Sequence, residues 1–200
     1  MVKIDLFEFR REVVHILVGI SFVMFLLFVP YAEFILFITL VVGCFVSFLS
    51  TIYCVPVIND FLCVFERECN MKKFPGKGII FFFIGSLLVL QLFPENIAIA
   101  SILILTFSDP ISHFVGANFG KTTLINKRKY IEGTIVGAIV GFLFASFFVN
   151  PFIAFAGAFI AMFLESVEIA MAEQTLDDNL LIPLVAGSVM KLLSLRLGIV

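Results

Sequence analysis

The chain has 200 residues, a formal net charge of −2 and a hydrophobic content of 62%, well above the roughly 45–50% of soluble domains. A chain of this composition cannot hide its apolar surface in water, so an ordinary soluble domain is excluded. The apolar runs are continuous rather than alternating, which predicts an all-α, polytopic membrane protein instead of a barrel. We expect a single domain over residues 1–200.

Seven helices are expected in chain order, at about residues 13–29, 33–53, 78–93, 97–109, 133–149, 151–165 and 180–195. Runs of this length reach or approach the roughly 20 residues that cross a hydrocarbon layer. Residues 55–65 are too short to span and contain Pro56, so we expect a re-entrant or interfacial piece there. The N-terminal residues are polar and no small-residue cleavage site follows the first apolar run, so that run is expected to remain as the first span.

The positively charged residues predict the orientation. Eleven of the 13 Lys and Arg residues precede the first helix or lie between helices two and three or four and five, and the intervening turns have none. The positive-inside rule places these segments in the cytoplasm. The expected cytoplasmic segments are 1–12, 66–77, 117–132 and 165–179. Polar groups of both signs therefore meet on the cytoplasmic face of what we expect to be a prokaryotic, including archaeal, cell membrane.

Asp109 ends an apolar run and is followed by Pro110. A carboxylate within a membrane is costly and is a functional candidate by default. Because proline lacks an N–H and disfavours helical geometry in the residue before it, we predict a broken helix near Asp109-Pro110. The alternative is that Asp109 only caps the segment after the break.

Small residues follow Asp109 at helical spacing. Asp109, His113, Gly116 and Gly120 lie three or four residues apart, hence on one helical face. Glycines let a phosphate approach the backbone closely, and Lys121 supplies positive charge, although the spacing does not match a P-loop. Alternatively, the glycines pack against another helix, and His113 is either a ligand, a proton carrier or a packing residue.

A basic cluster comes next, consisting of Lys121, Lys127, Arg128 and Lys129, and Glu132-Gly133 follows at once. Cations for phosphate oxygens beside an acid for a metal are the requirements of a Mg²⁺–triphosphate site. The cluster could instead only set topology or contact lipid headgroups. Gly133, Gly137 and Gly141 recur every fourth residue, which predicts tight packing of that helix.

Acidic residues gather in the last expected cytoplasmic segment: Glu165, Glu168, Glu173, Asp177 and Asp178. Metal or proton chemistry is the functional interpretation. The alternative is a solvated turn in which Asp177 or Asp178 caps the last helix.

Together these residues resemble the CTP-dependent lipid kinase family, which comprises dolichol (polyprenol) kinase, phytol kinase and the CTP-using diacylglycerol kinase. The central motif is carried by Asp109, Ser112, Gly116, Phe119, Gly120 and Lys121, then Lys127 or Arg128 upstream of Glu132-Gly133. An N-terminal element is similar at Arg11, His15 and Gly19, and a late one at Glu165, Asp177, Asp178, Asn179, Leu180 and Pro183. The chain departs from the pattern at Glu12, where the family has a lysine.

The resemblance implies transfer of the γ-phosphate of CTP to the hydroxyl of a membrane lipid alcohol, expected to be a polyprenol or dolichol-type isoprenoid. The expected CTP-binding residues are Ser112, Gly116, Gly120, Lys121, Lys127, Arg128, Lys129, Gly133, Arg11 and His15. The expected ligands of Mg²⁺, or of another divalent cation, are Asp109, Glu132, Asp177 and Asp178. The expected catalytic residues are Asp109, Glu132, Glu165 and Asp178, with Glu165 or Asp178 orienting or deprotonating the hydroxyl.

Three alternatives stay open on the sequence. A CDP-lipid synthase would attack the α-phosphate with similar residues and release pyrophosphate. A small ion-coupled transporter could use Asp109-Pro110 as a broken-helix ion site. A non-catalytic assembly protein would explain the glycines but not the acids facing the bases. The expected partners are the bilayer, a lipid substrate and a cytosolic nucleotide, without nucleic acid, and the pattern is compatible with a homo-oligomer.

Overall fold

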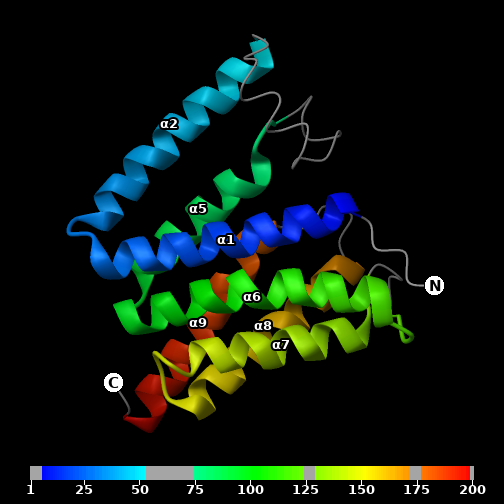
Figure 1. Ribbon diagram of the computed structural model, residues 1–200. Coiled ribbons are helices and arrows are strands. Elements are labelled where there is room, and N and C mark those ends of the chain that lie inside the picture. The colour runs from blue at the N-terminus through cyan, green and yellow to red at the C-terminus, as the bar shows by residue number, and fades with distance from the viewer. Residues whose placement is uncertain (1–5, 53–73, 124–128, 172–176, 199–200) are drawn as a thin grey trace.

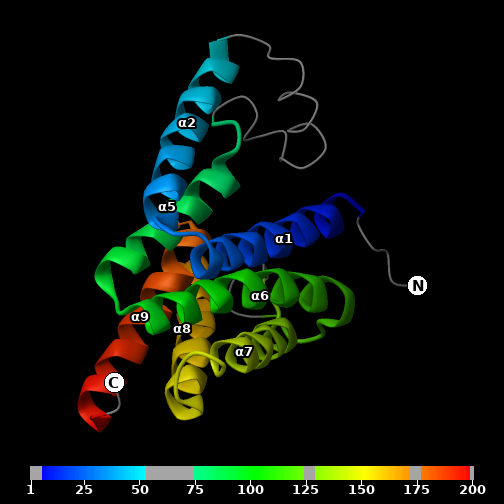
Figure 2. The ribbon, with the colours of Figure 1, turned by 60° about the vertical axis from the view of Figure 1, so that its left-hand side comes forward.

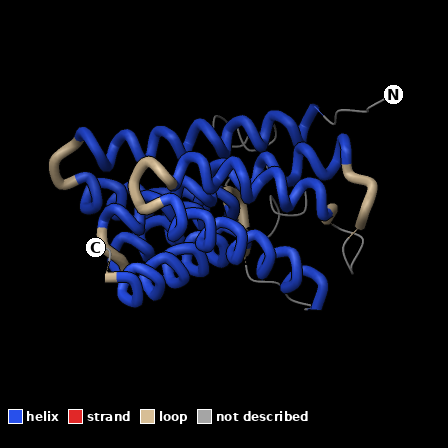
Figure 3. Tube along the Cα trace, turned by 90° about the horizontal axis from the view of Figure 1, so that it is seen from below, coloured by secondary structure: helices blue, strands red, loops and turns tan. Residues whose placement is uncertain are grey.

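The computed structural model describes residues 6–52, 74–123, 129–171 and 177–198. Within these ranges the chain forms α-helices and connecting loops without a β-strand (Figure 3). The helices are α1 (Leu6–Phe28), α2 (Ala32–Ile52), α5 (Lys77–Leu92), α6 (Glu95–Phe119), α7 (Ile131–Ala145), α8 (Pro151–Met171) and α9 (Asp178–Leu197). The all-α prediction is therefore confirmed. The expected re-entrant piece at 55–65 lies outside the described residues.

Four helices are long and apolar enough to cross a membrane by length and composition, namely α1, α2, α6 and α9. The apolar parts of α5, α7 and α8 are shorter. Large apolar side chains are exposed along α1 and α2 especially, as expected for helices that face hydrocarbon rather than water. The structure thus agrees with a helical membrane protein.

The α6 helix is the centre of the bundle. Its residues from Ile97 to Ser108 are all buried, and it contacts α1, α5, α7, α8 and α9. Figures 1 and 2 show α1 and α7 lying along opposite sides of α6, with α2 leaning away beside α5. Because α6 is surrounded by protein, it can carry polar side chains that a lipid-facing helix could not.

Pro110 does not break this helix. The broken-helix prediction was wrong, because α6 continues through Pro110 to Phe119. Proline removes only one backbone donor, the one that would reach the Thr106 carbonyl, and packing by neighbouring helices lets a membrane helix tolerate that loss. Pro110 is itself fully buried among those neighbours.

Several helix ends also differ from the prediction. The α1 helix begins at Leu6 rather than near residue 13. Arg11 forms an ion pair with Glu8 one turn earlier, which supports the helix there, and a second one with the adjacent Glu12. The α8 helix continues past Glu165 to Met171. Glu165, expected in a loop, is consequently a helical residue with no exposed surface.

Glycines determine how closely α7 packs on α6. A Cβ at Gly133 would overlap the Ser112 carbonyl oxygen, and one at Gly137 would lie 2.5 Å from the Ser108 carbonyl oxygen. Gly141 would likewise collide with the Ser108 side chain. The predicted tight packing of this helix through its glycine repeat is confirmed, and its partner is α6.

Candidate active site

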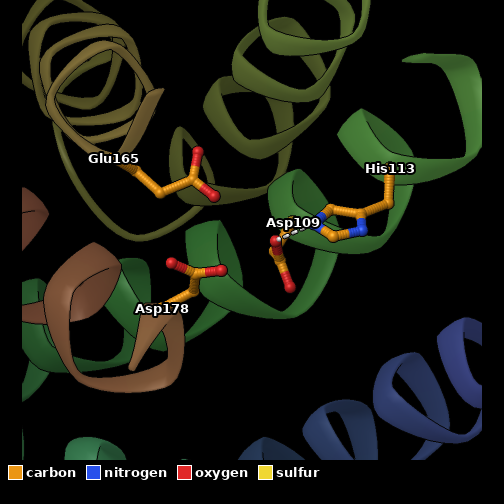
Figure 4. Close-up of side chains that lie close together, drawn as sticks. All are labelled: Asp109, His113, Glu165 and Asp178. Carbon is orange, nitrogen blue, oxygen red and sulfur yellow. Dashed lines mark ion pairs between the residues drawn. The ribbon is translucent and has the colours of Figure 1, made fainter. Parts of the chain in front are cut away.

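Four titratable side chains from three helices converge at one end of the bundle. Asp109 and His113 come from α6, Glu165 from α8 and Asp178 from α9 (Figure 4). Each offers one ligand atom, and these atoms all lie within 4.8 Å of one another. Acids at this separation repel unless a cation or proton lies between them. Three of the four, Asp109, Glu165 and Asp178, are among the residues that the sequence predicts as catalytic.

Asp109 and His113 form a pair on α6. They are one helical turn apart, so their side chains leave the same face, and His113 Nε2 lies 3.3 Å from Asp109 Oδ1. A histidine that contacts a carboxylate in this way restricts the orientation of the carboxylate. Because α6 is continuous through Pro110, the two side chains lie one helical turn apart on the same face.

Lys129 is the cation of the site. Its side chain is 9% exposed, its ammonium nitrogen forms an ion pair with Glu165, and it lies 3.8 Å from Asp109 Oδ1. Glu165 itself is fully buried, and its Oε2 atom has no hydrogen-bond partner among the described residues. A buried carboxylate oxygen with spare lone pairs is suited to a further cation.

Asp177 and Asp178 have different surroundings although they are adjacent. The Asp177 carboxylate caps α9 by accepting hydrogen bonds from the backbone and side chain of Asn179. It also forms an ion pair of 3.1 Å with Lys77 on α5. Only Asp178 joins the four-residue cluster. The described contacts of Asp177 are those of a helix cap, so its metal-binding role stays a prediction.

Hydrogen bonds join the two described ends of the connection between α6 and α7 beside the site. Thr122 N donates to both carboxylate oxygens of Glu132, at 3.0 and 3.2 Å, and Ile131 N donates to the Thr122 carbonyl. A hydrogen bond from its own backbone amide, together with those from Thr122, holds the pKa of Glu132 below its ordinary value, so the carboxylate is charged at neutral pH. Glu132 lies outside the four-residue cluster, and its predicted metal role stays a prediction.

Tyr130 anchors this connection to the end of α6. Its ring packs over Gly116 and Gly120, where a Cβ would meet the ring at 3.3 Å and would overlap it, respectively. Gly116, Gly120 and Gly133 thus pack against protein, which was the alternative interpretation of the small residues. Contact between any of them and a phosphate stays a prediction.

The other predicted CTP-binding residues are dispersed. Ser112 is buried beneath α7 and Lys121 is exposed, whereas Lys127 and Arg128 lie outside the described residues. His15 is half-buried in α1 with its ring edge-on to that of Phe82, at 5.3 Å between the ring centroids.

Glu12 is a neighbour of the site that the sequence analysis did not assign to it. It is 7% exposed, it accepts a hydrogen bond from Arg11, and its Oε1 lies 3.8 Å from His113 Nδ1. Its spacing of three from His15 and seven from Gly19 puts it on the same helical face. Gly19 contacts Thr106 of α6 so closely that a Cβ would overlap it. The spacing of Glu12, His15 and Gly19 is therefore the feature of the sequence that could have indicated that Glu12 faces α6.

Three curated proteins are similar in sequence. An uncharacterised protein of Methanocaldococcus jannaschii is 29% identical over 182 residues, covering 90% of this chain and 91% of that protein. An uncharacterised protein of Rickettsia prowazekii is 29% identical, covering 89% and 90%. CTP-dependent diacylglycerol kinase 1 of Schizosaccharomyces pombe is 31% identical over 140 residues, covering 61% of this chain and 62% of the kinase. No family model and no solved structure matches. The similarity to that kinase supports the resemblance to CTP-dependent lipid kinases.

Proposed function

We propose that this protein is a CTP-dependent lipid kinase, which transfers the γ-phosphate of CTP to the hydroxyl of a membrane lipid alcohol. The observation that carries the proposal is the convergence of Asp109, Glu165 and Asp178, with Lys129 against Asp109 and Glu165, in a bundle with membrane-length helices. Phosphoryl transfer needs positioning and charge neutralisation more than covalent chemistry from the protein. The similarity to a CTP-dependent diacylglycerol kinase supports the donor.

The donor set fits Mg²⁺. Carboxylate oxygens are its preferred protein ligands, and the buried Glu165 oxygen without a hydrogen bond is the kind of group that a metal would satisfy. We assign Asp109 and Glu165 as the ligands, because the Lys129 ammonium group lies against both carboxylates and a second cation would be attracted to the same oxygens. When bound, Mg²⁺ would neutralise charge on the phosphates. His113 contacts Asp109 and holds its orientation.

Asp178 is our choice as the residue that orients or deprotonates the lipid hydroxyl. It belongs to the four-residue cluster, and its ligand atom lies within 4.8 Å of those of Asp109 and Glu165. It is the first residue of α9 and directly follows Asp177, which caps the helix and forms an ion pair with Lys77, so its backbone is fixed. A base must lie within hydrogen-bond reach of the proton that it accepts, and a fixed backbone favours that geometry.

We place this chemistry on the cytoplasmic face of a prokaryotic membrane. The α1 and α9 helices begin at this end of the bundle and α6 ends there. Three described basic residues, Arg11, Lys77 and Lys129, form ion pairs at the same end. Lys121, Lys127 and Arg128 are proposed to contact the CTP phosphates. The two relatives that match nearly the whole chain come from an archaeon and a bacterium.

The lipid acceptor has two candidates. The motif resemblance favours a polyprenol or dolichol-type alcohol, and the named relative favours diacylglycerol. The transporter alternative loses its support, because it relied on a broken helix at Asp109-Pro110 and α6 is continuous there.

The test uses purified protein, Mg²⁺, γ-³²P-CTP or γ-³²P-ATP, and separate lipids: a polyprenol, geranylgeraniol, phytol, diacylglycerol and an archaeol-type diether. We expect label to enter the lipid phase from CTP and not from ATP, and the lipid that accepts it identifies the substrate. Label released as pyrophosphate would indicate CDP-lipid synthesis instead. Absence of transfer to every lipid, with no thermal stabilisation by CTP, would contradict the proposal.

A further inference from the structure

Lys129 occupies an unusual position for a residue predicted to bind phosphate. Its ammonium group is buried and lies against Glu165 and Asp109, the two acids that we assign to the metal. Its side chain is 9% exposed. A basic residue that only awaited a nucleotide would extend into solvent, as the exposed Lys121 does. Lys129 instead compensates the charge of acids that would otherwise be buried without a counter-ion.

The backbone beside Lys129 is fixed whereas its side chain is long. Tyr130 packs over Gly116 and Gly120, and Ile131 is hydrogen bonded to Thr122 at 3.0 Å. These contacts hold the start of α7 against the end of α6. A lysine ammonium group is carried on a flexible four-carbon stem. Rotation of that stem can therefore move the charge several ångströms without moving the helix.

We propose that Lys129 is an exchangeable counter-ion that couples metal binding to nucleotide binding. Without ligands its ammonium group neutralises Glu165 and Asp109. A divalent cation needs the same carboxylate oxygens, so it must displace Lys129, which weakens binding of the metal alone. Binding of the metal together with a nucleoside triphosphate gives the displaced ammonium group a new partner among the phosphate oxygens. The inference rests on the proposed function, because it takes the triphosphate as the second ligand.

The physical consequence is a positive coupling between metal and nucleotide. Two ligands that favour the same state of a protein strengthen each other, commonly by about 5- to 150-fold. A site that binds the metal well only when the phosphates are present would keep its buried carboxylates neutralised at all times. It would also avoid occupancy by free cations.

The test compares two binding constants in wild type and Lys129→Met. Mn²⁺ binding without nucleotide is followed by electron paramagnetic resonance of free Mn²⁺, and Mg²⁺–CTP binding by equilibrium dialysis. Lys129→Met should bind Mn²⁺ about tenfold more tightly, because the competing ammonium group is gone. It should bind Mg²⁺–CTP about tenfold more weakly, because the loss of a cation at the triphosphate outweighs the same relief at the metal. Opposite changes are the expected signature.

Other patterns contradict the inference. A merely structural lysine would weaken both affinities, a simple phosphate ligand would leave Mn²⁺ binding unchanged, and a simple counter-ion would tighten both. Lys191→Met is the matched control, because it removes the same charge from α9 about 20 Å beyond Asp178 along the helix. It should change neither constant.

A second variant keeps the test valid if Lys129→Met does not fold. Lys129→Arg retains the charge, and its planar fork can bind two carboxylate oxygens at once. It should therefore bind Mn²⁺ alone more weakly than wild type, and equal or tighter binding would overturn the inference. Lipid phosphorylation by the wild type without the opposite changes would disprove the coupling alone. Absence of lipid phosphorylation would disprove the proposed function, whatever the Mn²⁺ measurements give.

Discussion

His113 of α6 lies between two carboxylates, with its Nδ1 atom 3.8 Å from Glu12 Oε1 of α1 and its Nε2 atom 3.3 Å from Asp109 Oδ1. Glu12 is in turn hydrogen bonded by Arg11 at 2.8 Å. A chain of titratable groups therefore leads from the first helix to the centre of the site. Although α1 supplies no member of the four-residue cluster, it supports the orientation of one.

Replacement of Glu12 by Gln should lower kcat for lipid phosphorylation by up to about tenfold, the lower end of the range for residues that support a metal ligand, because Glu12 acts on Asp109 only through His113. KM for CTP should change little, because Glu12 acts on the metal ligand Asp109 through His113 and is not itself a proposed phosphate contact. Steady-state kinetics with the accepted lipid would measure both. Glu8→Gln is the matched control, since Glu8 also forms an ion pair with Arg11. Equal losses in the two variants would indicate that only the shared arginine contact matters.

Asp109→Asn and Glu165→Gln should each abolish metal binding and reduce transfer by more than about a hundredfold, because they remove proposed ligands of Mg²⁺. Both replacements are close in shape, and each removes negative charge from a crowded acidic site. The variants should therefore remain folded in detergent, which circular dichroism and thermal unfolding would check. Near-normal turnover in both would remove the basis of the proposed mechanism.

Glu132→Gln distinguishes a metal ligand from a loop contact. The described hydrogen bonds of Glu132 go to Thr122, and a neutral amide oxygen can still accept one of them. We therefore expect Mn²⁺ affinity to stay within about twofold of wild type and KM for CTP to rise several-fold as the connection loosens. A loss of Mn²⁺ binding as large as that of Asp109→Asn would instead establish Glu132 as a ligand, as the sequence predicted.

The sequence predicted the helical membrane class because its apolar runs are long and continuous, a signal that does not depend on tertiary contacts. It also predicted that Asp109, Glu165 and Asp178 matter, because acids are rare in such runs. It could not predict that α6 continues through Pro110, since only the surrounding helices make that tolerable. Local preference therefore gave the wrong result where burial is deepest.

The arrangement of the site required the structure for a different reason. Asp177 lies in the same predicted segment as Glu165 and Asp178, and Glu132 ends the predicted segment that follows Asp109 and His113, so sequence spacing does not separate either acid from the cluster residues. Their carboxylates instead accept local hydrogen bonds from Thr122 and Asn179. Conversely, Glu12 lies on another helix, and its proximity to His113 depends on how α1 crosses α6. Pairing across helices is set by packing geometry, which a single sequence does not encode in a readable pattern.

The glycine repeat gives a final prediction that links packing to the site. A Cβ at Gly137 would lie 2.5 Å from the Ser108 carbonyl oxygen and 2.9 Å from Ser112 Cβ, closer than atoms can approach without movement of a helix. Gly137→Ala should therefore lower the free energy of unfolding by about 1–3 kcal/mol, the usual cost of overpacking. It should also reduce activity, because α7 begins immediately after Lys129 and Tyr130 and would shift relative to Asp109.

Gly43→Ala is the control for this prediction. Gly43 lies within α2, and a Cβ there would meet no atom of the described residues within 4 Å. Because alanine favours a helix interior over glycine by about 1 kcal/mol, this variant should be as stable as wild type or more so, and fully active. Thermal unfolding in detergent and lipid phosphorylation would measure both variants. Equal stability of the two would mean that α7 can move away from α6 at little cost, and that the close contact between them does not position Lys129.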